Sequence, residues 1–397
     1  MRRTHTRGFL AGLAVLALGL TACAEDTGGE DAAGGGDQSG PIRIGAVLDI
    51  TGAGATLGVP ERKALEMLAR QVTEAGGIDG RGVELIIEDN QSTEDGAAKA
   101  MNKLVSQDKV DIVIGASRTG PSLAMRPIAE SAKIPMISLA ANAKIVDGSE
   151  WVFKTAQNDR VVLENIVDQA AAKGWTTIGL IRDASGFGEG VEEMLTELGG
   201  PRGIKVVKTE KFAPDATDFT AQMVNIRNAK ADANLIWGIP PAAGLAQKAY
   251  KQLGVTGAVI QSHGIGNQAF LDAAGPSADG LITPLGRLLV ADQLGADDPQ
   301  KKVIEKFVTD YRAAYPGESP STFAGHAYDA FQLAVAALGE VGTDGQKLRD
   351  HLEGVKGYAG VSGVFTMSAD DHSGLDKHAL AIVTVEKGAW KLVDDNR

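Results

Sequence analysis

The stretch IRIGAVLDITGAGATLG, residues 42–58, joins an apolar run of strand character to a loop that contains Gly52, Gly54 and Gly58. Apolar residues then recur at helical spacing over 60–75. A strand, a glycine-rich loop and a helix in this order form the first unit of an α/β fold.

The same alternation continues along most of the chain. Strands that alternate with helices favour parallel sheets covered by helices on both faces. The order of the units predicts two doubly wound lobes with a boundary at 151–158, and from 299 onward the pattern is mostly helical. Strands are predicted at 42–50, 83–88, 110–115, 134–139, 176–182, 204–210, 232–237, 257–262, 361–366 and 379–385, and helices at 60–75, 94–107, 159–173, 188–199, 217–229, 241–253, 299–314, 322–340 and 345–354.

The N-terminal 22 residues have the pattern of a secretory signal peptide. Three arginines precede an apolar core at 9–20, which is shorter than the roughly 20 residues of a transmembrane helix. Small residues lead into Cys23, the only cysteine, an arrangement that resembles the bacterial lipobox and predicts lipidation there. Residues 24–40 are mostly glycine, alanine and acid, so we expect a flexible tether. The protein is therefore expected to be exported and anchored by lipid to the outer face of the cell membrane.

The charge balance excludes some partners. Without the three arginines of the signal, 36 basic residues face 51 acidic ones, a net charge of −15. This balance argues against binding to nucleic acid or to anionic lipid headgroups through a basic surface. A folded part of about 357 residues suits two domains, and we expect a monomer.

Motifs for catalysis or cofactors fail on spacing. The glycines at 52, 54 and 58 do not match the dinucleotide fingerprint, and the nearest acids, Glu88 and Asp89, lie about 30 residues beyond them. The run 115–120 lacks the second glycine of a nucleophile elbow. No zincin-type histidine spacing occurs, and a polar turn explains 370–376 better than a metal site does. We therefore predict a protein that is not an enzyme, with no cofactor and no metal.

Small hydroxyl-rich loops follow three predicted strands of the first lobe. In open α/β sheets, ligands bind beyond the carboxyl ends of the strands. A helix that begins after such a loop offers free N–H groups and its positive dipole end. Three such loops predict a carboxylate site, although each is also explained as a helix cap. The loops run over 51–54, 117–120 and 138–142, and the ligand contacts expected from them are Thr51, Ser117, Arg118, Thr119, Ala140, Ala141 and Asn142.

The ordered set of motifs resembles the periplasmic-binding-protein family typified by leucine/isoleucine/valine-binding proteins, the capture subunits of ABC importers. The likeness covers 41 to about 395 and includes GGIDGRGVELIIEDN (76–90), IGASRTG (114–120), IPMISLAANA (134–143) and DASGFGEG (183–190). It implies a type I, Venus-flytrap fold, in which two Rossmann-like lobes are joined by three hinge crossings. Lobe 1 would comprise 41–155 and 285–364, and lobe 2 would comprise 156–284 and 365–397.

The resemblance also implies roles for individual residues. The loop from Ser117 to Thr119 would hold the ligand carboxylate, and the loop from Ala140 to Asn142 would complete this grip. Leu57 takes the place of an aromatic wall. The 239–241 region, with Pro240, takes the place of an aromatic contact from the second lobe. Arg118 either adds an anion contact or points to solvent, and Phe187, at the tip of a tight turn, is expected to cover the ligand.

His263 is the departure with the largest consequence, because it takes the place of the acid that binds the ammonium group of amino-acid ligands. A buried ammonium without its carboxylate costs on the order of 3–5 kcal/mol. We therefore predict an importer subunit that binds a small carboxylate without an α-amino group, aromatic or otherwise, and that partners an ABC permease. A sensing subunit for a membrane receptor and a true branched-chain amino acid binder remain the alternatives.

Overall fold

The structure is a computed structural model that describes residues 40–396. The predicted signal peptide, the lipidation site Cys23 and the tether up to residue 39 lie outside the described residues. No helix in the described part combines the length and apolar character needed to cross a membrane.

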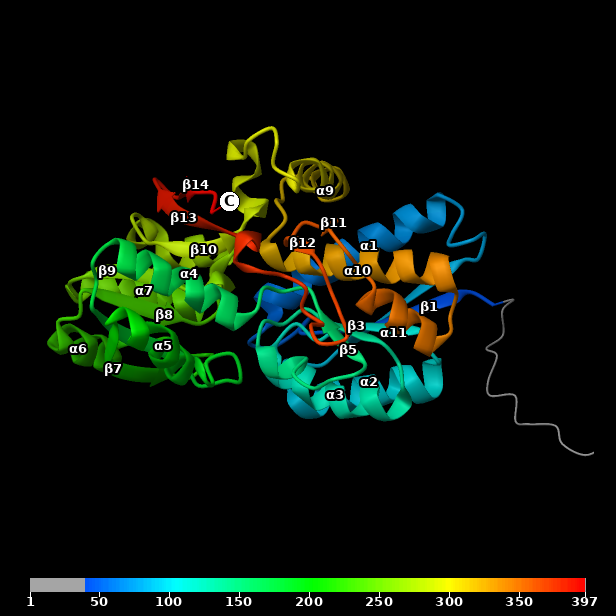
Figure 1. Cartoon of the computed structure of the whole chain (residues 1–397), viewed down its shortest axis with the longest axis horizontal. Coiled ribbons are helices and arrows are strands. Elements are labelled where there is room, and N and C mark those ends of the chain that lie inside the picture. The colour runs from blue at the N-terminus through cyan, green and yellow to red at the C-terminus, as the bar shows by residue number, and fades with distance from the viewer. Residues whose placement is uncertain (1–39, 397) are drawn as a thin grey trace, which may run out of the picture. The chain divides into compact units, whose positions relative to one another are not determined.

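The opening stretch supplies β1, an interior strand of a five-stranded parallel sheet with the order β2-β1-β3-β4-β5 (Figure 1). β1 is buried on both faces: Ile44, Ala46 and Leu48 point to one helical layer and Val47 to the other. Helices α1 and α10 cover one face and α2 and α3 cover the other. The bounds are β1 Ile42–Leu48, α1 Ala55–Glu74, β2 Val83–Asp89, α2 Glu94–Lys103, β3 Ile112–Gly115, α3 Thr119–Ala132, β4 Met136–Ser138 and β5 Val152–Lys154.

A second parallel sheet, with the order β7-β6-β8-β9, forms the core of the other lobe. Helices α4 and α5 pack on one face, and α6 and α7 pack on the other. The bounds are α4 Asp159–Ala172, β6 Thr177–Asp183, α5 Val191–Gly199, β7 Lys205–Phe212, α6 Thr220–Ala229, β8 Ala233–Trp237, α7 Ala242–Gln252, β9 Ala258–Gln261 and α8 Gln268–Ala274.

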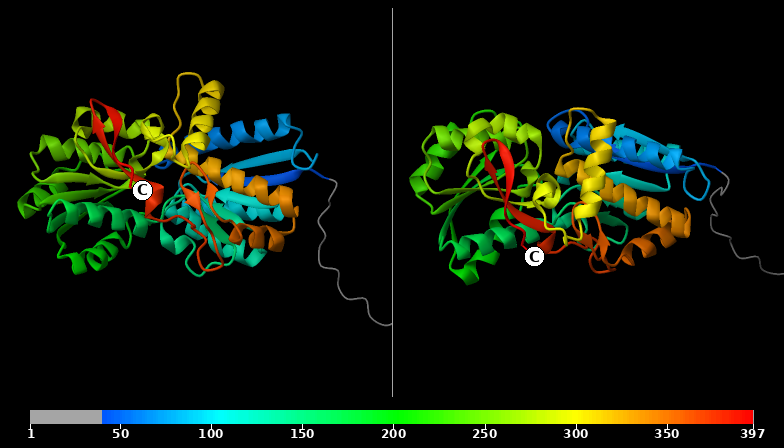
Figure 2. Two further views of the ribbon diagram at one scale, coloured as in Figure 1. Left: turned by 45° about the horizontal axis from the view of Figure 1, so that its top comes forward. Right: turned by 90° about the horizontal axis from the view of Figure 1, so that it is seen from above.

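The C-terminal third of the chain contributes to both lobes. After β10 (Thr283–Gly286), the helices α9 (Lys301–Ala314), α10 (Thr322–Val341) and α11 (Gly345–Glu353) return to the first lobe, where α10 packs along α1. The strands β13 (Leu380–Glu386) and β14 (Ala389–Asp394) then pair antiparallel beside β10 in the second lobe (Figure 2). The chain thus passes between the lobes three times, which confirms the predicted two-lobed α/β fold.

Some local predictions were incomplete. A helix was expected after the loop at 117–120, but the bounds of α3 were not predicted. α1 begins five residues before the predicted start, because Pro60 stands inside its first turns. The strand predicted at 361–366 is reduced to β12 (Val364–Phe365), which pairs with β11 (Tyr358–Ala359) in a short hairpin. β14 was also missed, because its outward side chains are polar or exposed.

Candidate ligand-binding site

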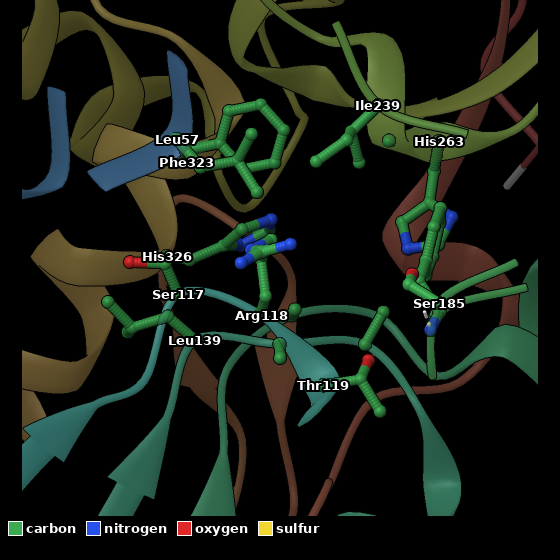
Figure 3. Close-up of a pocket in the computed structure, with 15 residues that line it drawn as sticks. Leu57, Ser117, Arg118, Thr119, Leu139, Ser185, Ile239, His263, Phe323 and His326 are labelled. Carbon is green, nitrogen blue, oxygen red and sulfur yellow. Dashed lines mark hydrogen bonds between the residues drawn. The ribbon is translucent and has the colours of Figure 1, made fainter. Parts of the chain in front are cut away.

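A cavity of about 460 Å³, its open mouth included, lies where loops at the carboxyl ends of strands from both sheets meet (Figure 3). Its walls are mainly apolar, with a few polar groups, as in small-molecule sites generally. The first lobe contributes Leu57, Ser117, Arg118, Thr119, Leu139, Ala140, Ala141, Phe323 and His326, the second contributes Ser185, Phe187, Ile239, His263 and Gly264, and Ala156 lies on the first crossing.

The beginning of α3 provides free donors on the first-lobe side. Arg118 is the N-cap residue, and Thr119 and Gly120 occupy the first helical positions, whose N–H groups have no partner within the helix. The Thr119 hydroxyl is buried and makes no hydrogen bond to the described residues. An unpaired buried hydroxyl costs free energy. A ligand anion at this helix end would satisfy both the hydroxyl and the amides.

Arg118 brings positive charge to the cavity, but it does so as part of a buried pair. Its Nε donates to Asp49, which is fully buried, and its Nη2 donates to the Ser92 carbonyl. Nη1 makes no hydrogen bond to the described residues, and the guanidinium points into the cavity in Figure 3. The residue predicted either to bind an anion or to face solvent therefore lines the cavity.

Ser117 has less freedom than its neighbours. Its hydroxyl contacts the Glu61 carboxyl group, and it also accepts from the Asp49 N–H at 3.0 Å. Burial raises the pKa of Glu61 well above its ordinary value. Because the Ser117 hydroxyl donates to Glu61, its hydrogen is not free to point into the cavity.

Aromatic side chains form the second-lobe wall. The Phe187 ring lies 5.2 Å from the Trp237 ring and 5.7 Å from that of His263, measured between centroids. The Trp237 indole N–H donates to the Phe187 carbonyl at 3.0 Å and fixes the tip of this loop. These contacts lie within the second lobe, so the wall does not depend on the ligand for its hydrogen bond and ring packing.

Direct hydrogen bonds join the lobes at the margin of the cavity. The Thr56 hydroxyl donates to the Pro240 carbonyl at 2.8 Å, and the Asn267 amide donates to the Thr56 carbonyl at 3.1 Å. The Asn142 amide donates to the Gly186 carbonyl at 3.1 Å. The structure is therefore a closed form of the two lobes.

Two buried histidines face the cavity, one from each lobe. Burial, aided by nearby His326 and Lys154, lowers the pKa of His263 to about 3. Burial and Lys154 lower the pKa of His326 to about 3 as well. Both rings are therefore neutral at neutral pH. His326 Nδ1 lies 2.9 Å from the Ser362 hydroxyl, whereas His263 Nδ1 makes no hydrogen bond to the described residues.

The low pKa of His326 predicts a pH dependence of stability. Between about pH 3 and 6.5 the unfolded chain binds a proton at this residue and the folded protein does not, so its contribution to stability is lost as the pH falls. Asp329, whose pKa burial raises to about 7, acts in the opposite direction. We therefore expect the free energy of unfolding of the wild type, relative to His326→Phe, to fall by about 1 kcal/mol from pH 6 to pH 5. Urea denaturation at the two pH values measures this difference. An unchanged difference between the wild type and His326→Phe at the two pH values would contradict the assignment.

Eight of the predicted ligand contacts line this cavity, and three do not. Thr51 donates its hydroxyl to Asp89 at 2.6 Å, Asn142 bridges to the second lobe, and Pro240 accepts from Thr56. Their proposed contacts with a ligand stay predictions. The contacting residues are Leu57, Ser117, Arg118, Thr119, Ala140, Ala141, Phe187 and His263.

Sequence reasoning missed His326 and Phe323. Both lie on α10, which is buried along almost its whole length, so the apolar pattern of 322–340 indicates only a core helix. The polar turn at 370–376 does not reach the cavity: His372 stacks on Phe153 and hydrogen-bonds the Val152 carbonyl. Among the described residues, no group of acids and histidines is arranged to hold a metal ion.

The fold and this interlobe cavity define a class of solute-binding proteins with two hinged lobes. The family model described as Periplasmic binding protein matches residues 41–389, so the chain belongs to this family. One curated relative is the leucine-, isoleucine-, valine-, threonine- and alanine-binding protein of Pseudomonas aeruginosa. It is 26% identical over 259 residues, which span 63% of this chain and 68% of the relative.

Solved structures with the same architecture include an extracellular ligand-binding receptor from Rhodopseudomonas palustris HaA2. The TM-score is 0.84 and the identity 30%, over 89% of this chain and 99% of that one. A branched-chain amino acid transporter substrate binding protein from Streptococcus pneumoniae, in complex with isoleucine, has a TM-score of 0.77 and 26% identity, over 89% and 99%. A solute binding protein of an ABC transporter from R. palustris, in complex with benzoate, shares the fold at a TM-score of 0.78 and 23% identity, over 89% and 96%.

Proposed function

We propose that the protein is the solute-binding lipoprotein of an ABC importer and that it captures a small carboxylate without an α-amino group, with an aromatic acid the best candidate. The family supports solute binding. Export, lipidation at Cys23 and delivery to a permease belong to the proposal. Export and lipidation follow the signal and lipobox pattern of the sequence, and delivery to a permease follows the family.

One observation carries the choice of ligand: no aspartate or glutamate is among the residues that line the cavity. The anion end of a ligand meets Arg118, the Thr119 hydroxyl and the first amides of α3. An ammonium group would meet neutral His263 at the place where the family resemblance puts an acid. The site therefore matches a ligand with one negative charge and no positive charge.

The magnitudes favour the same choice. Charge-assisted hydrogen bonds contribute about 1.5–3 kcal/mol each, so two or three approach the roughly −8 kcal/mol of a micromolar complex. A buried ammonium without a counter-charge removes on the order of 3–5 kcal/mol from that sum. The loss is large enough to turn a micromolar amino acid ligand into one that binds in the millimolar range.

The apolar walls support one competing ligand class. Leu57, Leu139 and Ile239 would also enclose a branched aliphatic side chain. The names of the P. aeruginosa relative and of the S. pneumoniae structure refer to amino acids with such side chains. A branched-chain amino acid is therefore the second candidate ligand.

Matched pairs of ligands separate the two candidates. We expect 4-methylpentanoate to bind more tightly than leucine, and 3-phenylpropanoate more tightly than phenylalanine, by about two to three orders of magnitude, because each pair differs only in the amino group. Isothermal titration calorimetry with unfolded and refolded protein, which has lost any co-purified solute, measures the constants. In His263→Glu, the added carboxylate should shift each ratio toward the amino acid. Tighter binding of leucine by the wild type would overturn the proposed ligand class.

A further inference from the structure

The two histidines of the cavity belong to different lobes and approach the same space. His263 follows β9 in the second lobe, and His326 lies on α10 of the first. Figure 3 shows their rings entering the cavity from opposite sides. Both residues are more than nine-tenths buried, with exposed fractions of 6% and 4%. Bulk water is therefore a poor partner for their ring nitrogens once the lobes close.

The surroundings fix the His326 ring but leave one of its nitrogens for the cavity. Nδ1 pairs with the Ser362 hydroxyl at 2.9 Å. The Asp329 carboxylate accepts the N–H groups of Val361 and Ser362, both at 2.7 Å, and so holds that loop against α10. The Thr155 hydroxyl donates to the His326 carbonyl at 2.9 Å. No hydrogen bond from Nε2 to a described residue is formed, so this atom is available to a ligand.

His263 also has a ring nitrogen without a partner. Its Nδ1 is buried and has no hydrogen-bond partner among the described residues. A neutral imidazole has one donor and one acceptor nitrogen. Two such rings across a cavity therefore offer both a donor and an acceptor, and neither offers a charge. Most of the remaining lining, from Leu57 to Phe323, is apolar and cannot satisfy them.

We infer that His326, together with His263, recognises an uncharged hydroxyl group on the ligand, at a place separate from its carboxylate. A hydroxyl both donates and accepts, so it can bridge the two rings and join the lobes through the ligand. The inference rests on the proposed function, since it specifies the rest of the same carboxylate ligand. It makes hydroxylated acids the preferred solutes and His326 a specificity-determining residue.

Calorimetric titration of hydroxylated and parent acids tests this assignment. The probes are benzoate with its 3- and 4-hydroxy forms, and 3-phenylpropanoate with its 4-hydroxyphenyl form. We expect at least one hydroxylated acid to bind the wild type about tenfold or more tightly than its parent, because a site built for a hydroxyl leaves polar groups unpaired without it. In His326→Phe the preference should fall to about one. His351→Phe, a half-exposed histidine on α11 outside the cavity, is the matched control and should keep the preference.

Circular dichroism shows whether His326→Phe folds. If it does not, a second variant tests the same inference. Ser362→Ala frees the ring without removing it, and it should reduce the hydroxyl preference severalfold. Equal binding of parent and hydroxylated acids by the wild type would overturn the inference and leave the proposed function standing. A hydroxyl preference that persists in both His326→Phe and Ser362→Ala would also overturn the inference and leave the proposed function standing. If none of these carboxylates binds, the proposed ligand class and the inference both fail.

Discussion

Arg118→Met is expected to weaken carboxylate binding by two to three orders of magnitude. The substitution removes the one cationic side chain that lines the cavity among the described residues. It also leaves the ligand's charge to the Thr119 hydroxyl and the helix amides alone. Truncation of one partner of a buried charge pair costs about 2–5 kcal/mol. Calorimetric titration with the tightest acid of the panel gives the change in the dissociation constant.

The same substitution should lower stability, because Asp49 is fully buried and would lose its counter-charge. Breaking a buried pair in this way costs about 3–5 kcal/mol. The double variant Asp49→Asn/Arg118→Met removes both charges, so its melting temperature should recover much of the loss while its ligand affinity should not. Recovery of affinity in the double variant would contradict a direct role for Arg118 and point to a disordered loop.

Gly58→Ala should be the most damaging small substitution in α1. A Cβ at this position would overlap the backbone of Asp49, including its carbonyl oxygen, so α1 could not pack against the end of β1. Overpacking against backbone typically costs about 1–3 kcal/mol and sometimes more. We expect a loss of roughly 3 kcal/mol in the free energy of unfolding. Weaker ligand binding should accompany it, since the neighbouring Leu57 lines the cavity.

Gly339→Ala on α10 is the matched control. A Cβ there would lie 3.7 Å from Ile78 Cγ2, an ordinary van der Waals contact. Alanine in a helix is preferred over glycine by about 0.5–1 kcal/mol, so this variant should be slightly more stable than the wild type. Guanidinium denaturation followed by circular dichroism compares the two. Similar denaturation midpoints for the two variants would show that α1 can shift to accommodate a Cβ at position 58, and would contradict the predicted loss.

Elements with a regular hydrophobic periodicity were predictable from the sequence, and elements whose residues favour different structures were not. β1 and α10 are long and apolar in a regular pattern, and both were predicted within a few residues. Helix α3 contains Pro121 and Pro127, which are ordinary signals for a turn. Its first turn tolerates proline, and packing against α2 supplies the rest. Local propensity cannot report such tertiary support.

The candidate site divides in the same way. Hydroxyl loops after strands and a resemblance to a known family were sufficient to name Ser117, Thr119 and His263, which the structure brings to one cavity. Nothing in the local sequence distinguished His326, because a histidine within an apolar helix pattern is typical of a buried helix position. Only the return of the chain to the first lobe places it opposite His263. Contacts between residues so distant in sequence depend on topology rather than on local pattern.

The pairing of Arg118 with Asp49 has a consequence for the conditions under which the protein operates. Because the two charges largely cancel at a distance, the site projects little attractive field, and the net negative charge of the chain does not favour the approach of an anion. Capture therefore relies on contacts made after arrival rather than on long-range steering. Mobile ions screen exposed charges over about 8–10 Å but affect buried pairs far less. The dissociation constant should accordingly vary little with ionic strength.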